Sequence, residues 1–224
     1  MSNLTLLIPA KYEFESLPIF LKELDKFDHK KIVILDQNDT ETISAAKQFN
    51  DVEILFQKKK GYGNALIEGI NYTKTEFFSI INADGSMNPN ELNSMLDEIV
   101  KNNQDVIFGS RYMKNAGSED DDLITTVGNF IFSFIGKFFF NLKISDILYT
   151  YVVGKTKLVK DLELKSQDFK FCIELPIKAH RYNYNYTSYP CYERKRIAGK
   201  KKVSPFLDGL RILFGMIFLF FKRN

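Results

Sequence analysis

Short apolar runs alternate with segments of helical periodicity over the first 110 residues, and this alternation constrains the fold more than any other feature. The runs lie at residues 4–8, 31–35, 52–56, 77–83 and 105–109. Apolar side chains at helical spacing mark segments 16–27 and 40–49, the segment after Ala65, and segment 89–101. Strands and helices that alternate in this way predict an α/β fold, with a mainly parallel, doubly wound sheet, helices on both faces and right-handed crossovers.

The chain changes character after Arg111. Residues 112–122 form an acidic, glycine-containing segment that we expect to be a mobile flap, and residues 123–142 are strongly apolar with six phenylalanines. The uncharged part, 123–136, is shorter than the roughly 20 residues that cross a bilayer, and a core helix is the alternative interpretation. We expect another helix at 169–181, a strand at 184–192 and a closing helix at 205–221.

The closing helix carries a continuous apolar run at 212–221, bounded by Arg211 and by Lys222-Arg223. A short apolar run flanked by cations is typical of a helix that lies in the membrane interface, and a buried terminal helix is the alternative. We therefore predict one globular domain over 1–203, with a nucleotide-binding half at about 1–111 and an acceptor half at about 112–203, followed by an interfacial helix at 204–224.

Charge and residue types narrow the classes of partner. The formal net charge is only +3, but six cations gather at 194–202, which implies an anionic partner: nucleic acid, acidic lipid or a phosphorylated substrate. Two cysteines and two histidines are too few for a zinc or iron–sulfur site, so any metal would be oxygen-ligated Mg²⁺ or Mn²⁺. The start of the sequence shows no secretory signal, so we expect a cytoplasmic protein.

Polar residues follow four successive predicted strands. They are Pro9 with Glu13, Asp36, Lys60-Gly61 and Asp84. The carboxyl ends of parallel strands meet at one edge, where open α/β sheets bind ligands. Carboxylates there can accept hydrogen bonds from a base or ribose, and a lysine can face phosphate. Each residue alone is explained as a turn or cap; together they predict a nucleotide site.

The stretch Asn82-Ala83-Asp84-Gly85-Ser86 ends the fourth strand. A carboxylate beside an amide and a hydroxyl suits a hard cation that holds a diphosphate, whereas a plain strand-to-helix turn capped by Ser86 or Asn88 is the alternative. Gly61-Tyr62-Gly63 is weaker evidence for phosphate binding, because it lacks the ending of a nucleotide-triphosphatase loop and the third glycine of the dinucleotide motif.

The ordered set of motifs resembles the family-2 glycosyltransferases of the GT-A (Rossmann-like) fold, and within them the polyprenyl-phosphate (dolichol-phosphate) sugar transferases. The matching pieces cover nearly the whole chain: Leu6-Leu7-Ile8-Pro9 with Glu13 to Pro18, Val33-Ile34-Leu35-Asp36, Lys60-Gly61-Tyr62-Gly63-Asn64-Ala65, Asn82 to Ser86 with Pro89, Gly109-Ser110-Arg111-Tyr112, Ile144-Ser145-Asp146, Glu174 with Pro176, and Arg196 to Gly199 with Lys202 and Asp208-Gly209.

The resemblance implies a role for each matching residue. The nucleotide sugar, GDP- or UDP-linked, would be bound by Pro9, Glu13, Asp36, Lys60, Gly61 and Asp84. The metal, Mg²⁺ or Mn²⁺, would be held by Asp84 with Asn82 and Ser86. The acceptor phosphate would be bound by Arg111, Arg194, Arg196 and Lys202. The catalytic set would be Asp84, Asp146 and Arg111.

This sequence departs from the family pattern at several positions. Gln37 replaces the second acid usual after Asp36, and Asn82 replaces the first acid of the metal motif. Because an amide brings no negative charge, metal affinity should fall. Tyr149-Thr150-Tyr151 stands where many relatives have Ser-Gly-Phe, and Phe130 stands where some have arginine; these changes bear on the identity of the acceptor more than on the fold.

The expected function is metal-dependent, inverting transfer of a sugar from a nucleotide diphosphate to a polyprenyl (dolichyl or undecaprenyl) phosphate, by a peripheral enzyme on the cytoplasmic face of a membrane. Alternatives are another lipid or glycan acceptor, or a decayed relative acting as a membrane scaffold, and less favoured is a sugar nucleotidyltransferase. A membrane-protein partner is left open. Nucleic-acid binding is not expected, because it gives the acidic residues at the strand ends no role.

Overall fold

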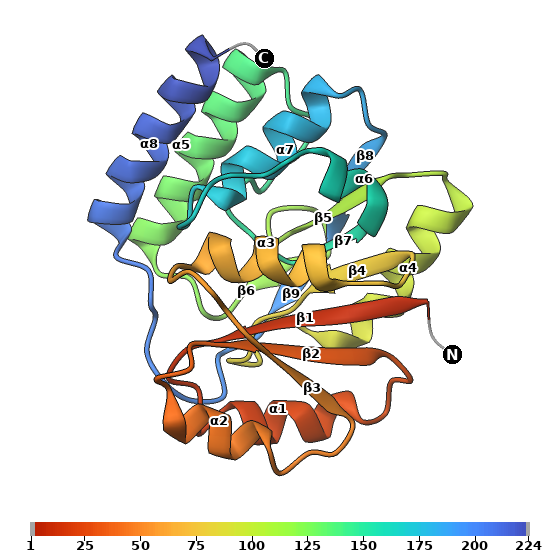
Figure 1. The fold of residues 1–224 in the computed structure, drawn as a ribbon. Helices are drawn as coiled ribbons and strands as arrows, with labels where there is room; N and C mark the ends of the chain where they lie inside the picture. Colours follow the sequence, from red (N-terminus) through yellow and green to blue (C-terminus); the bar gives the residue numbers. More distant parts are fainter. Residues whose placement is uncertain (1–2, 223–224) are drawn as a thin grey trace.

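The computed structural model describes residues 3–222 and contains one large sheet (Figure 1). Seven strands lie in the order β3-β2-β1-β4-β7-β5-β8, and of these only β7 runs antiparallel to its neighbours. The strands are β1 Leu4–Ala10, β2 Lys30–Leu35, β3 Val52–Phe56, β4 Phe77–Ile80, β5 Val106–Ser110, β7 Val152–Lys155 and β8 Tyr186–Pro190. A separate pair, β6 (Gly117–Ser118) and β9 (Tyr192–Glu193), forms a small second sheet.

Helices cover both faces of the large sheet, as the alternating pattern predicts. One apolar core lies under α1 (Leu17–Leu24), α2 (Thr40–Ala46) and α4 (Leu92–Lys101), which follows the short 3₁₀ helix η1 (Pro89–Glu91). The other core lies under α3 (Tyr62–Tyr72), α5 (Leu123–Phe140), α6 (Thr156–Asp161), α7 (Phe171–Arg181) and α8 (Pro205–Phe221). The mainly parallel, doubly wound architecture is therefore confirmed.

The differences from the sequence prediction lie mostly in the second half. The predicted strand 77–83 pairs only as far as Ile80, and the predicted strand 184–192 is divided between β8 and β9. The sequence pattern missed α6 and β7. Strand β7 has only four residues and inserts between β4 and β5, so its place depends on long-range pairing and not on a local apolar run.

The strand register brings the predicted site residues to one edge. Ala10 at the end of β1 pairs with Leu35 at the end of β2, and Leu35 pairs with Phe56 at the end of β3. On the other side, Leu7 of β1 pairs with Ile80 at the end of β4. The residues that follow β1, β2, β3 and β4 therefore emerge at the same edge of the sheet.

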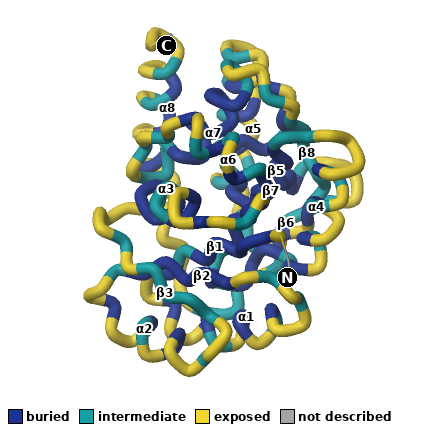
Figure 2. The backbone as a smooth tube through the Cα atoms, turned by 45° about the vertical axis from the view of Figure 1, so that its right-hand side comes forward, coloured by how far each residue is buried: buried dark blue, intermediate teal, exposed yellow. Residues whose placement is uncertain are grey.

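Helices α5 and α8 lie side by side (Figure 1), and much of the surface that they form is exposed to solvent (Figure 2). We call this surface the α5/α8 face. Among the described residues, 16 of the 26 exposed large hydrophobic side chains belong to these two helices: Leu123, Ile124, Val127, Phe130, Ile131, Phe134, Phe138 and Phe139 of α5, and Phe206, Leu207, Leu210, Phe214, Ile217, Phe218, Phe220 and Phe221 of α8.

This exposure corrects the alternative in which residues 123–142 are a core helix, because only Asn129, Ser133 and Gly136 of α5 are buried. Within the described residues, α5 is the one helix long and apolar enough to cross a membrane, and 17% of it is buried. Length and composition alone are weak evidence for a span. The predicted helix 205–221 is confirmed, and it too is mostly exposed.

A buried ion cluster fastens the acidic segment 112–122 to the sheet. The Arg111 guanidinium lies 2.7 Å from Asp146, 2.9 Å from Asp121 and 3.1 Å from Glu193. Three carboxylates around one cation leave an excess of negative charge, and burial raises the pKa of Glu193 although Arg111 opposes the shift. The segment predicted to be a mobile flap is thus tied at Asp121, and the cluster depends on one arginine.

We predict that Arg111→Ala lowers the free energy of unfolding by about 3–5 kcal/mol at pH 7, because it leaves buried carboxylates without their cation. Chemical denaturation measures the loss. Lys101→Ala removes one side of the exposed Lys101–Asp97 pair and should cost less than about 1 kcal/mol.

The loss should also depend on pH. A carboxyl whose pKa in the folded protein exceeds its unfolded value stabilises the fold at low pH and destabilises it as pH rises. Removing Arg111 removes the charge that opposes this shift at Glu193, so the folded pKa of Glu193 rises further. The deficit of Arg111→Ala relative to wild type should therefore shrink as pH falls from 7 towards the ordinary glutamate value of 4.5. A deficit that is equal at both pH values would contradict this account of the cluster.

Candidate functional site

The carboxyl edge of β1 to β4 carries acidic side chains that each face a cation. Glu13 lies 3.0 Å from Lys202, Asp36 lies 3.8 Å from Lys60, and Asp84 lies 3.5 Å from Arg196. All six residues belong to the predicted sets: four to the nucleotide set (Glu13, Asp36, Lys60 and Asp84) and two to the acceptor-phosphate set (Arg196 and Lys202). The edge is therefore a surface of paired opposite charges.

Asp36 follows β2 and lies in a short turn. Its Oδ1 accepts hydrogen bonds from the backbone and side-chain amides of Asn38. These bonds, chiefly the backbone one, lower the pKa of Asp36, and the charges of Lys60 and Lys11 act in the same direction. Asp36 is therefore an ionised acceptor at neutral pH, as binding to the hydroxyls of a ribose requires.

Gly61 and Gly63 open α3 against another loop of the same chain. A Cβ on Gly61 would lie 2.2 Å from the carbonyl oxygen of Gln167, and one on Gly63 would lie 2.1 Å from that of Ser166. Gly61 also has a φ of +122°, which only glycine adopts readily. Packing against residues 166–168 explains both glycines, and contact of Gly61 with a nucleotide stays a prediction.

The Asp84 carboxylate projects from the turn after β4. Its Oδ1 accepts hydrogen bonds from the Ser86 backbone N–H and hydroxyl, at 3.1 and 3.0 Å, and its Oδ2 faces Arg196. These hydrogen bonds stabilise the turn itself, as the alternative interpretation expects. The 3₁₀ helix that follows is capped by Asn88 and not by Ser86. Because Oδ1 is used within the turn, Oδ2 is the atom of Asp84 that can bind a ligand if Arg196 moves.

The residues present fit a divalent cation only in part. No group of three or more His, Cys, Asp or Glu side chains is arranged to hold a metal within residues 3–222. The set Asp84, Asn82 and Ser86 offers one carboxylate and two neutral oxygens. Such a set suits a hard cation that takes most of its oxygen ligands from a diphosphate and water.

A basic strap, residues 194–204, joins β9 to α8 and crosses this edge of the sheet, past the ends of β1 and β2 (Figure 1). Its backbone is fixed to the Asp84 turn, because the N–H of Arg194 donates to the Ser86 carbonyl and that of Ile197 donates to the Asp84 carbonyl, both at 2.8 Å. The Ile197 side chain packs on Gly85, where a Cβ would lie 2.3 Å away. The strap thus covers the predicted metal site.

The strap's cations have distinct partners. Arg196 makes two hydrogen bonds to Asp120, at 2.7 and 3.1 Å, in addition to facing Asp84. Arg194 instead pairs with Glu23 and with the Gly85 carbonyl. Of the predicted acceptor-phosphate residues, Arg196 and Lys202 therefore lie at the nucleotide edge, whereas Arg194 is engaged beside α1.

Arg111 and Asp146 form the buried cluster described above. Both are less than a tenth exposed, and Asp146 accepts hydrogen bonds from the Arg111 side chain and backbone. A pair that satisfies itself inside the protein suits a positioning role better than direct contact with a substrate. Direct catalytic roles for Arg111 and Asp146 stay untested predictions.

Sequence reasoning missed several residues that shape the edge. Tyr12 has a φ of +54°, unusual for an aromatic residue, and it is held there by a hydrogen bond from its N–H to Asp39. Asp39 also caps α2, which the start of segment 40–49 could have indicated. Tyr62 and Thr150 lie in two of the motifs above, but the hydrogen bond between them was not predicted. It joins positions 88 residues apart, and no local sequence pattern indicates such a contact.

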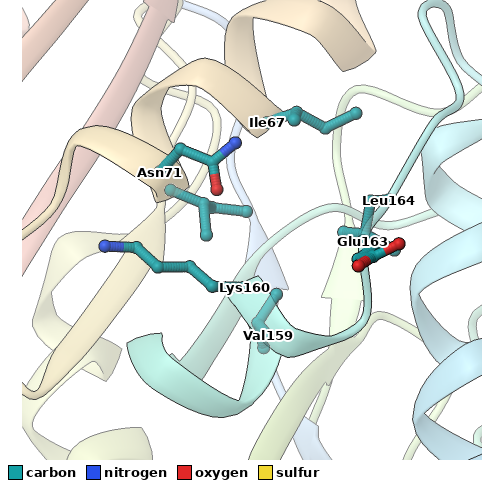
Figure 3. A pocket seen from close by; sticks show the side chains of 7 residues that line it. Ile67, Asn71, Val159, Lys160, Glu163 and Leu164 are labelled. Atoms are coloured by element: carbon teal, nitrogen blue, oxygen red, sulfur yellow. The ribbon is translucent and has the colours of Figure 1, made fainter.

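A hollow of about 170 Å³ lies between α3 and α6, and Figure 3 shows the side chains around it. Ile67 and Asn71 come from the second half of α3, and Val159 and Lys160 come from α6. Because α3 starts at the carboxyl edge, its second half lies towards the opposite edge of the sheet. None of the predicted site residues lines this hollow.

Comparison with known proteins agrees with this geometry. Residues 5–163 match the model of the family described as glycosyl transferase family 2. Similar proteins include uncharacterized glycosyltransferases of Mycobacterium tuberculosis and Mycobacterium bovis, each 24% identical over 205 residues, which cover 92% of this chain and 91% of the relative. The family match spans more than half of the described chain.

Solved structures show the same fold. Glucosyl-3-phosphoglycerate synthase from Mycobacterium tuberculosis, in complex with Mn²⁺, uridine diphosphate and phosphoglyceric acid, aligns with a TM-score of 0.70 at 10% identity over 99% of this chain and 79% of that one. Mannosyl-3-phosphoglycerate synthase from Rubrobacter xylanophilus aligns with a TM-score of 0.68 at 11% identity over 96% and 71%. The structural likeness establishes the GT-A fold, and with the family match it shows that this chain belongs to the family-2 glycosyltransferases.

Proposed function

We propose that this protein transfers a sugar from a nucleotide diphosphate to a phosphorylated lipid at a membrane surface, with polyprenyl phosphate as the acceptor. The observation that carries the proposal is that the donor edge and the α5/α8 face are directly connected in sequence. The basic strap that covers Asp84 continues directly into α8, and the acidic segment that pairs with the strap continues directly into α5. The donor edge is thus joined to the α5/α8 face by two short segments.

The donor half of the proposal rests on the charges at the strand ends. Asp36 offers an acceptor for the nucleoside hydroxyls, while Arg196, Lys202 and Lys60 offer cations for phosphate oxygens. A divalent cation on Asp84 would supply positive charge at the departing diphosphate. The Mn²⁺ and uridine diphosphate bound by the solved mycobacterial synthase support this choice of donor and cofactor.

The chemistry needs little help from a general base. A phosphate monoester is largely ionised near neutral pH, its second pKa being about 6. Its oxygen can therefore attack the anomeric carbon while the bond from that carbon to the nucleoside diphosphate breaks, which inverts the configuration. Arg196 and Lys202 would stabilise the charge on the leaving group, an effect that is often worth several kcal/mol.

The acceptor half rests on the α5/α8 face. Sixteen exposed large apolar side chains gather on these two neighbouring helices, and extended exposed apolar patches mark protein or membrane contacts. Lys200, Lys201 and Lys202 precede α8 and Lys222 ends it, so cations flank the apolar side chains. Apolar side chains flanked by lysines suit an anionic membrane surface.

A small phosphorylated acid is the second candidate acceptor. The structural neighbours are synthases of glucosyl- and mannosyl-3-phosphoglycerate, and one was solved with phosphoglyceric acid bound. The strap cations could equally bind such an acceptor. The α5/α8 face favours the lipid, because a soluble acceptor gives that face no role.

We predict that Asp84→Ala lowers sugar transfer at least about 100-fold, because the developing charge on the diphosphate loses its cation. The assay supplies GDP- and UDP-sugars, Mn²⁺ or Mg²⁺, and polyprenyl phosphate in vesicles, and it measures sugar incorporated into lipid. Asp97→Ala, on the exposed face of α4, is the matched control and should keep full activity. Circular dichroism checks that each variant is folded.

The outcomes separate the candidate functions. Transfer that survives Asp84→Ala unchanged would refute the site. Transfer to phosphoglyceric acid but not to polyprenyl phosphate would replace the lipid acceptor. Nucleotide binding without transfer to either acceptor would favour the catalytically decayed scaffold.

We also predict that Phe214→Ser combined with Phe218→Ser weakens binding to anionic vesicles about tenfold or more, because two exposed aromatic side chains leave the interface. The control is Ile19→Ser combined with Val100→Ser, two comparably exposed positions on the opposite face of the sheet. Co-sedimentation with vesicles measures binding. Equal loss in both double variants, or no loss in the first, would contradict docking through the α5/α8 face.

A further inference from the structure

Asn82, the residue that stands in place of an acid, takes part in a chain of side-chain hydrogen bonds. It follows β4, and its Oδ1 accepts a hydrogen bond of 3.0 Å from the Tyr62 hydroxyl at the start of α3. The Tyr62 hydroxyl also lies 2.7 Å from the Thr150 hydroxyl, just before β7. Three elements that are distant in sequence thus meet at the Tyr62 hydroxyl.

The direction of these hydrogen bonds is fixed by the number of protons. A tyrosine hydroxyl has one proton, and that of Tyr62 is donated to Asn82, so Thr150 must donate to Tyr62. A phenol such as that of Tyr62 has an ordinary pKa of about 10, so it carries its proton at neutral pH. Its ring is held by stacking on Phe169, with centroids 5.1 Å apart. Tyr62 is therefore a fixed donor to Asn82.

This arrangement determines which end of the Asn82 amide faces a ligand. Oδ1 points towards Tyr62, so Nδ2 points to the other side of the planar amide. Within residues 3–222, Nδ2 has no hydrogen-bond partner, and Asn82 is not fully buried. The side chain therefore turns its two amide protons away from Tyr62, while Oδ1 faces Tyr62 and uses one of its two lone pairs for that hydrogen bond.

We infer that Asn82 binds the nucleoside diphosphate directly, by donating from Nδ2 to an oxygen of that ligand, and that Tyr62 and Thr150 are the residues that position it. The inference rests on the proposed function, and it replaces the metal-ligand role that the sequence resemblance implies for Asn82. Asp84 would then be the one carboxylate of this turn available to hold a cation.

The inference explains how this edge can bind a nucleotide with asparagine, and not an acid, at position 82. Aspartate at position 82 could only accept, so next to phosphate oxygens it would need a cation between the two negative groups. Asparagine at the same place attracts those oxygens by itself. Nucleotide binding should therefore depend less on metal in this protein than in an Asn82→Asp variant.

The test is a cycle of nucleotide dissociation constants. UDP and GDP are titrated by calorimetry in EDTA and in saturating Mn²⁺, and the ratio of the two constants measures the coupling between nucleotide and metal. Asn82→Ala should weaken binding about tenfold or more in both conditions, as expected for loss of a hydrogen bond to a charged group, and leave the ratio unchanged. Asp84→Ala should bring the ratio close to 1.

Three further variants, each a conservative substitution, keep the test independent of folding. Tyr62→Phe removes only the donor hydroxyl, and it should weaken nucleotide binding several-fold at an unchanged ratio, whereas Tyr72→Phe, at the exposed end of α3, should change neither. Asn82→Asp should weaken binding in EDTA and increase the ratio.

A fall of the ratio in Asn82→Ala, comparable to that in Asp84→Ala, would show that Asn82 is a metal ligand and would overturn the inference alone. Wild-type binding in Tyr62→Phe would remove its positioning role. Failure of wild type to bind either nucleotide would overturn the proposed function and this inference with it.

Discussion

The parallel pairing of β1 with β2 on one side and β4 on the other is the constraint on which the site depends. This register places Asp36, Glu13 and Asp84 at one edge, although almost 50 residues separate Asp36 from Asp84. Carboxylates gathered in this way repel one another unless cations neutralise them. The basic strap supplies the cations that face Glu13 and Asp84, and Lys60, which follows β3, supplies the one that faces Asp36.

Charge pairing also links the site to the surface of the molecule. Arg196 faces Asp84 and pairs with Asp120, and these two partners lie in the turn after β4 and in the segment before α5. An anionic donor would compete with both carboxylates for the same guanidinium. Arg196 thus joins the turn that carries Asp84 to the segment that leads into α5.

The sequence was sufficient to predict the layers of the fold and the edge at which polar residues gather, because both depend on local apolar runs and on the residues that follow them. It could not place β7, whose four residues acquire their position by pairing with β4 and β5. It also could not show that Arg111 and Asp146 satisfy each other in the interior, or that Tyr62 holds the Asn82 amide. Those contacts join residues 20 to 88 positions apart, and no periodicity records them.

The central claim is that a nucleoside diphosphate and its cation bind at the carboxyl edge, against Asp84 and beneath the strap. A crystal structure of the protein with Mn²⁺ and UDP or GDP tests this most directly. The account predicts the cation at coordination distance, about 2 Å, from an Asp84 carboxylate oxygen, with Arg196 moved from Asp84 to the diphosphate. Nucleotide bound elsewhere, for example in the hollow between α3 and α6, with the strap still paired to Asp84, would contradict it.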